Sequence, residues 1–139
     1  HTDEPALFSG DTLFNAGAGN VHNGGNVNEL FATFVNQLAN LPDNTRVYPG
    51  HDYIENNLRF TLAREPSNAE AQAMLPQVAG HDPATSAVTT LADEKRINTF
   101  MRLDSRGVID RLRADYPELA AQPDARTVFT RLRELRNKW

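Results

Sequence analysis

Two short apolar segments of this chain each run into a glycine turn that carries a side chain able to bind a metal ion. Residues 6–9 lead into Gly10 and Asp11, and residues 45–48 lead through Pro49 into Gly50 and His51. Open α/β sheets place their chemistry at the carboxyl ends of neighbouring strands. An aspartate and a histidine at such an edge suit zinc, iron or manganese. Taken alone, neither residue establishes a metal site. An aspartate after glycine, for example, is commonly a turn residue or a helix cap.

The pattern between and beyond these segments predicts helices. Asn26 and Glu29 have the spacing of a helix N-cap, and an apolar stripe follows them up to residue 41. A second helix is expected to open at Asp52 and Glu55 and to run to about residue 64. The alternation of strand and helix stops near residue 65. Further helices are predicted from residue 67, with an interruption near Pro76, over 91–97, from 105 and after 124.

Several short motifs occur in a fixed order along the chain. They are Gly10-Asp11-Thr12-Leu13-Phe14, Tyr48-Pro49-Gly50-His51-Asp52-Tyr53 and Phe100-Met101-Arg102. In this order they closely resemble glyoxalase II, the hydroxyacylglutathione hydrolase family, whose members have the metallo-β-lactamase fold. The resemblance implies an α/β segment over 1–65, the C-terminal half of a metallo-β-lactamase αββα sandwich. It implies an all-α C-terminal domain of the glyoxalase II type over 66–139.

One motif of that family does not occur here. The family carries a Thr-His-x-His-x-Asp-His run in its N-terminal half, whereas this chain has only four histidines, at positions 1, 22, 51 and 81. We therefore expect the chain to be the C-terminal part of a larger enzyme and to be inactive alone. Two ligands are fewer than the three protein ligands of a catalytic zinc site.

The resemblance also implies a chemistry for the two turn residues. In the family, the aspartate that matches Asp11 bridges two metal ions, and the histidine that matches His51 binds one of them. Asp11 and His51 are thus the expected catalytic and metal-binding residues. The two ions, zinc or else iron or manganese, lower the pKa of a bound water and polarise the thioester carbonyl. The implied reaction is hydrolysis of a glutathione thioester such as S-lactoylglutathione.

Five further residues are expected to bind the substrate. Tyr53 matches a tyrosine that contacts the glutathione backbone. Arg102 and Arg106 match a basic pair that holds the glycine carboxylate, a task suited to the planar guanidinium group. Asn20 and His22 stand where the family usually has a cation and a tyrosine, so glutathione affinity is expected to be weaker than is typical for the family.

Charge is unevenly distributed along the chain. Residues 1–95 carry a net −8 and residues 96–139 a net +4. A solvated helical face explains this, and a field that attracts an anionic substrate is the alternative. Aromatic residues are scarce among the arginines, so nucleic acid is not an expected partner. No apolar run approaches the length of a membrane span. The absence of cysteine fits a cytoplasmic enzyme, and an exposed half-sheet could support a dimer.

Two other classes of function stay open at this stage. One is another reaction on the same scaffold, such as that of a lactonase or a persulfide dioxygenase. The other is a non-catalytic helical interaction module formed by residues 66–139. Metal content separates the second class from the hydrolase, because a pure interaction module should bind no metal.

Overall fold

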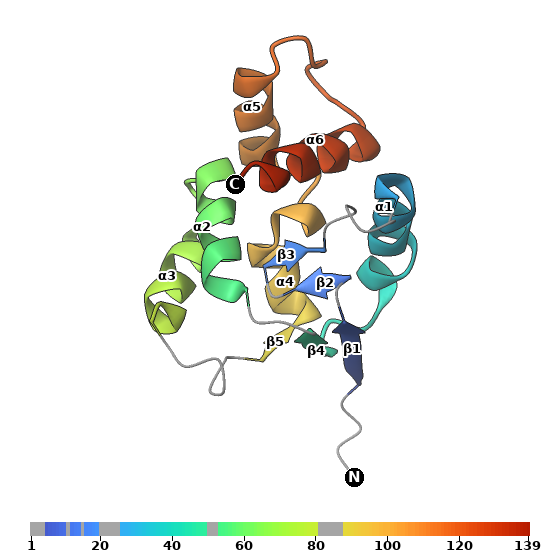
Figure 1. Cartoon of the computed structure of the whole chain (residues 1–139), viewed down its shortest axis with the longest axis vertical. Helices are drawn as coiled ribbons and strands as arrows, with labels where there is room; N and C mark the ends of the chain where they lie inside the picture. The colour runs from blue at the N-terminus through green and yellow to red at the C-terminus, as the bar shows by residue number, and fades with distance from the viewer. Residues whose placement is uncertain (1–4, 11, 15, 20–25, 50–52, 81–87) are drawn as a thin grey trace.

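The chain has a mixed α/β fold that is largely helical (Figure 1). A computed structural model describes residues 5–10, 12–14, 16–19, 26–49, 53–80 and 88–139. The strands are β1 (Ala6–Gly10), β2 (Leu13–Phe14), β3 (Gly17–Ala18), β4 (Arg46–Pro49) and β5 (Thr89–Thr90). The helices are α1 (Val27–Asn36), α2 (Ile54–Arg64), α3 (Ala69–Val78), α4 (Leu91–Ile97), α5 (Arg106–Asp115) and α6 (Ala125–Asn137), with 3₁₀ turns η1 (Leu38–Asn40) and η3 (Thr99–Met101).

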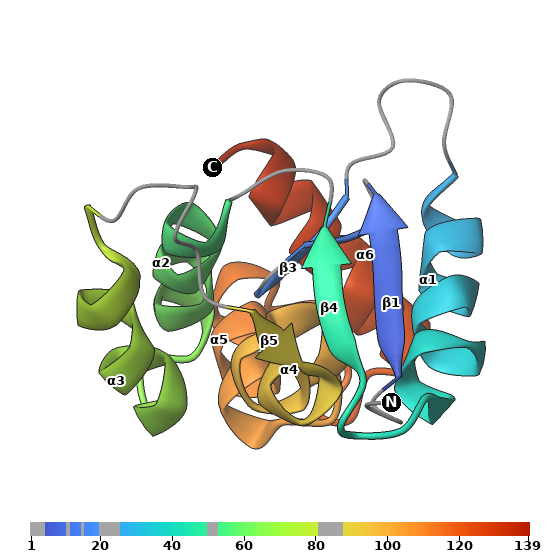
Figure 2. The same cartoon turned by 90° about the horizontal axis from the view of Figure 1, so that it is seen from below.

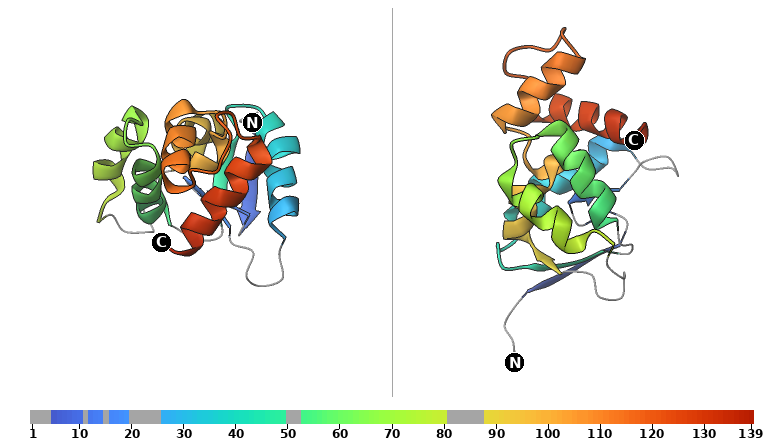
Figure 3. Two further views of the ribbon diagram at one scale, coloured as in Figure 1. Left: turned by 90° about the horizontal axis from the view of Figure 1, so that it is seen from above. Right: turned by 90° about the vertical axis from the view of Figure 1, so that its left-hand side faces the viewer.

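The larger sheet has the order β1-β4-β5 and is covered by helices on one face only (Figures 2 and 3). β1 and β4 are neighbours in this sheet, as predicted, and they run parallel, with Leu7 opposite Val47 and Phe8 opposite Tyr48. Leu7 and Val47 pack into the helical core, whereas Phe8 is 80% exposed on the other face and stacks on Tyr48. The sheet therefore presents an uncovered aromatic face. β2 and β3 form a separate antiparallel hairpin.

Local capping chemistry explains where most of the helices begin. Asn26 caps α1 as predicted, by accepting a hydrogen bond from the backbone N–H of Asn28. Thr90 forms a capping box with Asp93 at the start of α4. Asp124 accepts from the backbone N–H of Thr127 and starts α6. The predicted cap at Asp52 lies outside the described residues.

The third helix differs from the prediction in two ways. Its N-cap is Asn68, which accepts from the backbone N–H of Ala71, so the helix begins one residue later than the Ser67 pattern suggested. It also runs unbroken through Pro76 to Val78. Pro76 removes only the hydrogen bond to the carbonyl of Gln72, and both residues are exposed close to the end of the helix. Water can therefore satisfy that carbonyl at little cost.

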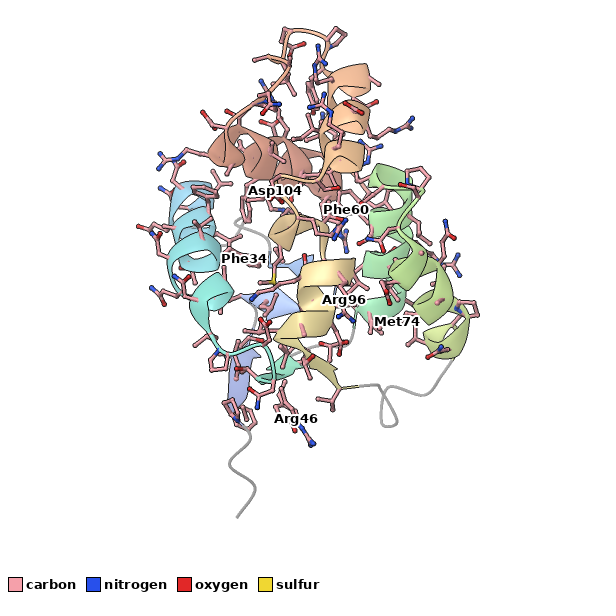
Figure 4. The ribbon with its side chains drawn as sticks, turned by 180° about the vertical axis from the view of Figure 1, so that it is seen from behind. Phe34, Arg46, Phe60, Met74, Arg96 and Asp104 are labelled. Carbon is pink, nitrogen blue, oxygen red and sulfur yellow. The ribbon has the colours of Figure 1, made fainter. Side chains whose placement is uncertain are left out.

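The main hydrophobic core draws on segments from the whole length of the chain. Phe34 of α1 and Phe60 of α2 reach it from opposite sides of the molecule (Figure 4). Phe100 of η3, only 1% exposed, lies within 5.2–6.5 Å of the rings of Phe34, Phe60 and Phe129. This core contains residues on both sides of position 65, so the division into 1–65 and 66–139 stays a prediction.

No helix in the part of the chain that the structure describes has both the length and the apolar character needed to cross a bilayer.

The position of Phe100 gives a test of this core. We expect Phe100→Ala to lower the free energy of unfolding by about 3–5 kcal/mol, because truncation leaves a cavity among three other rings. Phe8→Ala is the control, since its ring is largely exposed, and we expect a change within about 0.5 kcal/mol. Urea unfolding followed by circular dichroism measures both. Equal losses for the two variants would contradict the assignment of Phe100 to the centre of the core.

Candidate functional site

The strands that precede the predicted metal ligands end side by side. Gly10 of β1 lies opposite Pro49 of β4 in the parallel register. The chain segments that carry Asp11 and His51 therefore leave the sheet at the same edge. Asp11 and His51 themselves, like Asn20 and His22, lie outside the described residues, so a shared site within about 8 Å stays a prediction. Among the residues that are described, no cluster of three or more His, Cys, Asp or Glu side chains could hold a metal.

The start of α2 and the end of α6 meet at this same end of the molecule (Figure 2). The indole Nε1 of Trp139 donates to Asn56 Oδ1 at 3.0 Å, and its ring packs edge-on against Phe60. Tyr53, predicted to contact the substrate, immediately precedes α2 and is exposed. Two arginines on the last turns of α6 complete this region.

Arg133 and Arg136 project from α6 toward the hairpin and α2. One terminal nitrogen of Arg133, Nη1, donates to the carbonyls of Ala18 and Gly19 at 2.8 Å each. Arg136 donates through Nε and Nη2 to Asn57 Oδ1, at 3.3 and 3.2 Å. Arg133 is only 5% exposed. Within the described chain neither arginine has a carboxylate partner, which is uncommon for a guanidinium group as buried as that of Arg133.

Burial disfavours the charged forms of both arginines. Burial, together with the neighbouring charge of Arg136, lowers the pKa of Arg133 to about 10. Burial also lowers the pKa of Arg136. Two neighbouring positive charges with reduced access to water repel each other, so binding of an anion that contacts both is favourable. A carboxylate is well matched, because a guanidinium presents paired N–H donors to its two oxygens. The pair is therefore a candidate anion site.

The hairpin that faces Arg133 is held by polar side chains of α4. Ala16 has a left-handed backbone with φ 59°, and its N–H donates to both carboxyl oxygens of Glu94, at 3.0 and 2.9 Å. Asn98 donates through Nδ2 to the carbonyl of Gly17 at 3.0 Å. A Cβ at Gly17 would lie 2.5 Å from the side-chain nitrogen Nδ2 of Asn57, so any larger residue would force the Asn57 side chain to move.

Arg102, predicted to hold the substrate carboxylate, has an internal partner. Its Nε and Nη2 donate to the two carboxyl oxygens of Glu65 at 2.8 and 2.7 Å. This hydrogen bonding raises the pKa of Arg102. Burial opposes ionisation of Glu65, but the bonds from Arg102 and Ser105 outweigh it and lower the pKa of Glu65. Arg106 is half-exposed and pairs with Asp110 of its own helix at 2.8 Å. The role of Arg102 and Arg106 in substrate binding stays a prediction.

Sequence reasoning did not single out Arg133 and Arg136, although the sequence contains a signal. They lie four residues after Phe129 and Leu132, so they continue the apolar stripe of α6 instead of its polar face. Arginines at stripe positions point toward the core side of a helix.

Residues 52–139 match the family described as "Hydroxyacylglutathione hydrolase C-terminus". The chain belongs to this family. The resemblance to glyoxalase II is thereby confirmed. The match begins at residue 52, so it takes in α2 together with the later helices, and it contains both the Arg102–Arg106 and the Arg133–Arg136 pairs.

Curated relatives in the same family cover this chain along nearly its whole length. It is 74% identical over 139 residues to a hydroxyacylglutathione hydrolase of Polaromonas sp. (strain JS666), which covers 100% of this chain and 53% of the relative. It is 62% identical over 138 residues to one from Nitrosococcus oceani, with 99% and 52% covered. It is 44% identical over 140 residues to one from Anaeromyxobacter dehalogenans, with 97% and 53% covered. The chain thus spans about half the length of these relatives.

The buried carboxyl of Glu94 predicts a pH dependence of stability. Burial raises its pKa from an ordinary value near 4.5 to about 8, against the opposing hydrogen bond from Ala16. The folded state therefore binds this proton more tightly than the unfolded state. The resulting stabilisation is complete below about pH 4.5 and is lost as pH rises through about 8.

We therefore expect the unfolding free energy of the wild type, relative to Glu94→Gln, to fall between pH 5 and pH 9. Urea unfolding at several pH values measures the difference. Parallel curves for the two proteins would contradict the assignment of this titration to Glu94.

Proposed function

We propose that this chain is the C-terminal part of a metal-dependent hydroxyacylglutathione hydrolase, which cleaves a glutathione thioester to glutathione and a hydroxy acid. The observation that carries the proposal is the arginine pair of α6, the buried Arg133 and the partly buried Arg136. They lack carboxylate partners in the described chain and lie at the end of the molecule where the segments bearing Asp11 and His51 leave the sheet. Glutathione carries two carboxylates, so its thioesters suit such a site. Family membership supports the same substrate.

In this proposal the two arginines bind one carboxylate of the glutathione moiety. Among the described residues, Nη2 of Arg133 and Nη1 of Arg136 have no hydrogen-bond acceptor. These nitrogens can donate to a carboxylate without breaking an existing bond. Arg102 would first have to give up Glu65, a bidentate partner. The geometry therefore favours Arg133 and Arg136 for the task that sequence reasoning gave to Arg102 and Arg106.

The residues at the sheet edge have the donor types that a metal centre requires. A carboxylate from Asp11 and an imidazole from His51 fit zinc, iron or manganese, and the paired ends of β1 and β4 bring their segments to one edge. When bound, two such ions would supply an activated water and polarise the thioester carbonyl. Tyr53 would line the path between the arginines and this edge, and the role of Asn20 and His22 in substrate binding stays a prediction. The remaining ligands would come from an N-terminal half.

The uncovered face of the β1–β4 sheet supports the same architecture. Phe8 and Tyr48 stack there with ring centroids 5.2 Å apart, and Phe8 is largely exposed. We propose that the rest of an αββα sandwich covers this face in the whole protein. The expected cytoplasmic location stays a prediction.

Joining this chain to the N-terminal half of the Polaromonas relative gives an enzyme in which the proposal can be tested. We expect the joined protein to hydrolyse S-lactoylglutathione and to lose activity on metal removal. Arg133→Ala and Arg136→Ala should each raise KM, with kcat little changed, because they bind a part of the substrate remote from the bond that breaks. A lost charge-assisted hydrogen bond is worth about 1.5–3 kcal/mol, which corresponds to roughly tenfold to a hundredfold in KM.

The control substrate is a thioester of a thiol that has no carboxylate. Its kcat/KM should not respond to either arginine change. Arg102→Ala provides the comparison with the other basic pair. If Arg102→Ala alone raises KM for S-lactoylglutathione, the carboxylate is held there and the assignment to Arg133 and Arg136 is wrong. Hydrolysis of lactones but not of thioesters would point to a different reaction on the same scaffold.

The 139-residue chain alone should self-associate through the exposed sheet face. We expect Phe8→Ser to shift the chain toward monomer, because it removes the largest exposed apolar side chain of that face. Sedimentation velocity over a range of concentrations measures this. A wild-type chain that stays strictly monomeric would count against the proposal.

A further inference from the structure

Glu94 of α4 is a fully buried acidic residue that has no cationic partner among the described residues. Its Oε1 and Oε2 both accept from the backbone N–H of Ala16, and Oε1 accepts from Thr89 Oγ1 at 3.1 Å. The charged group whose field acts on it is its neighbour Asp93, which has the same sign. Burying a carboxyl in this way is costly. A hydrophobic side chain would fill the same space at lower cost, so packing alone does not account for Glu94.

The group that Glu94 holds is itself unusual. Ala16 is the only non-glycine residue of the described chain with a positive φ, 59°. For an L-residue with a Cβ, this conformation is strained and persists only where surrounding contacts enforce it. Glu94 supplies one such contact through the Ala16 N–H. Asn98, the C-cap of α4, supplies a second through the carbonyl of Gly17.

The hairpin fixed by these contacts leads directly to Arg133. The carbonyls of Ala18 and Gly19 are the two acceptors of Arg133 Nη1. Only Gly17 separates the residue that Glu94 holds from the first of those carbonyls. With Nη1 bound to the hairpin and Nε bound to Asn137, the direction of the remaining nitrogen, Nη2, is determined.

We propose that Glu94 is a positioning residue for substrate recognition. By fixing the left-handed turn at Ala16, it aims the carbonyls of Ala18 and Gly19 at Arg133 and so directs Nη2 toward the carboxylate of the thioester's glutathione moiety. The inference rests on the proposed function, in which Arg133 binds that carboxylate. It assigns to α4 a role in specificity, although no atom of Glu94 touches the substrate.

The test compares Glu94→Ala, Glu94→Gln and Asp115→Asn. Asp115 pairs with Arg64, far along the sequence from the hairpin, and serves as the structural control. Unfolding curves first establish that each variant is folded. Binding of glutathione is then followed by the fluorescence of Trp139, which is the only tryptophan of the chain and lies beside the arginine site.

We expect Glu94→Ala to weaken glutathione binding by about tenfold, the effect of misaligning one charge-assisted hydrogen bond. Glu94→Gln keeps one side-chain acceptor for Ala16 and should recover most of the affinity. Asp115→Asn should bind as the wild type does. Unchanged affinity in a folded Glu94→Ala protein would overturn the inference, as would an equal loss in Asp115→Asn.

A second measurement does not depend on any ligand. In the nuclear magnetic resonance spectrum, the Arg133 Nε–H signal should shift in Glu94→Ala and stay in place in Asp115→Asn. The Ala16 amide signal should move as pH rises through about 8 in the wild type and not in Glu94→Gln. If the Arg133 signal does not move in Glu94→Ala, the positioning role is excluded. If these signals behave as expected but Arg133→Ala leaves glutathione binding unchanged, the proposed function fails and the coupling of Glu94 to Arg133 stands.

Discussion

The packing of three phenylalanine rings around Phe100 is the contact on which the rest of this structure depends. Phe34, Phe60 and Phe129 come from α1, α2 and α6, and η3 places Phe100 between them. Because these segments are far apart in sequence, their burial in one core packs α6 against α1, α5 and η3 and brings its last turns beside the β2–β3 hairpin and α2. The arginine site exists only as a result of that packing.

Hydrogen bonds from polar side chains then hold the β2–β3 hairpin against the helices that the core packs together. The hairpin β2–β3 is too short to be stable alone, and side chains of α4 and α6 bind its backbone at Ala16, Gly17 and Ala18. Each of these bonds satisfies a buried polar group that would otherwise be costly. The helical segment and the strand segment thus form the candidate site jointly.

Much of the local structure could be predicted, and the misses have specific causes. Caps at Asn26 and Asp124 and the apolar stripes identified α1 and α6 because those signals act within one or two turns. Pro76 misled the prediction because its effect depends on how close it lies to the helix end and to water. β5 is only two residues long, and it pairs with β4 across more than forty residues, so no periodicity could reveal it.

The sequence by itself determined where α1, α4 and α6 begin, that two strand-like segments precede Asp11 and His51, and to which family the chain belongs. Only the tertiary structure decided which arginines lack a carboxylate partner among the described residues. Arg102 is neutralised by Glu65, 37 residues away, whereas Arg133 meets the hairpin carbonyls 114 and 115 residues away and keeps a nitrogen for an anion. Capping and amphipathic periodicity are local properties of the chain. The partner of a buried charge is set by which distant segments the core brings together, and no local pattern encodes that choice.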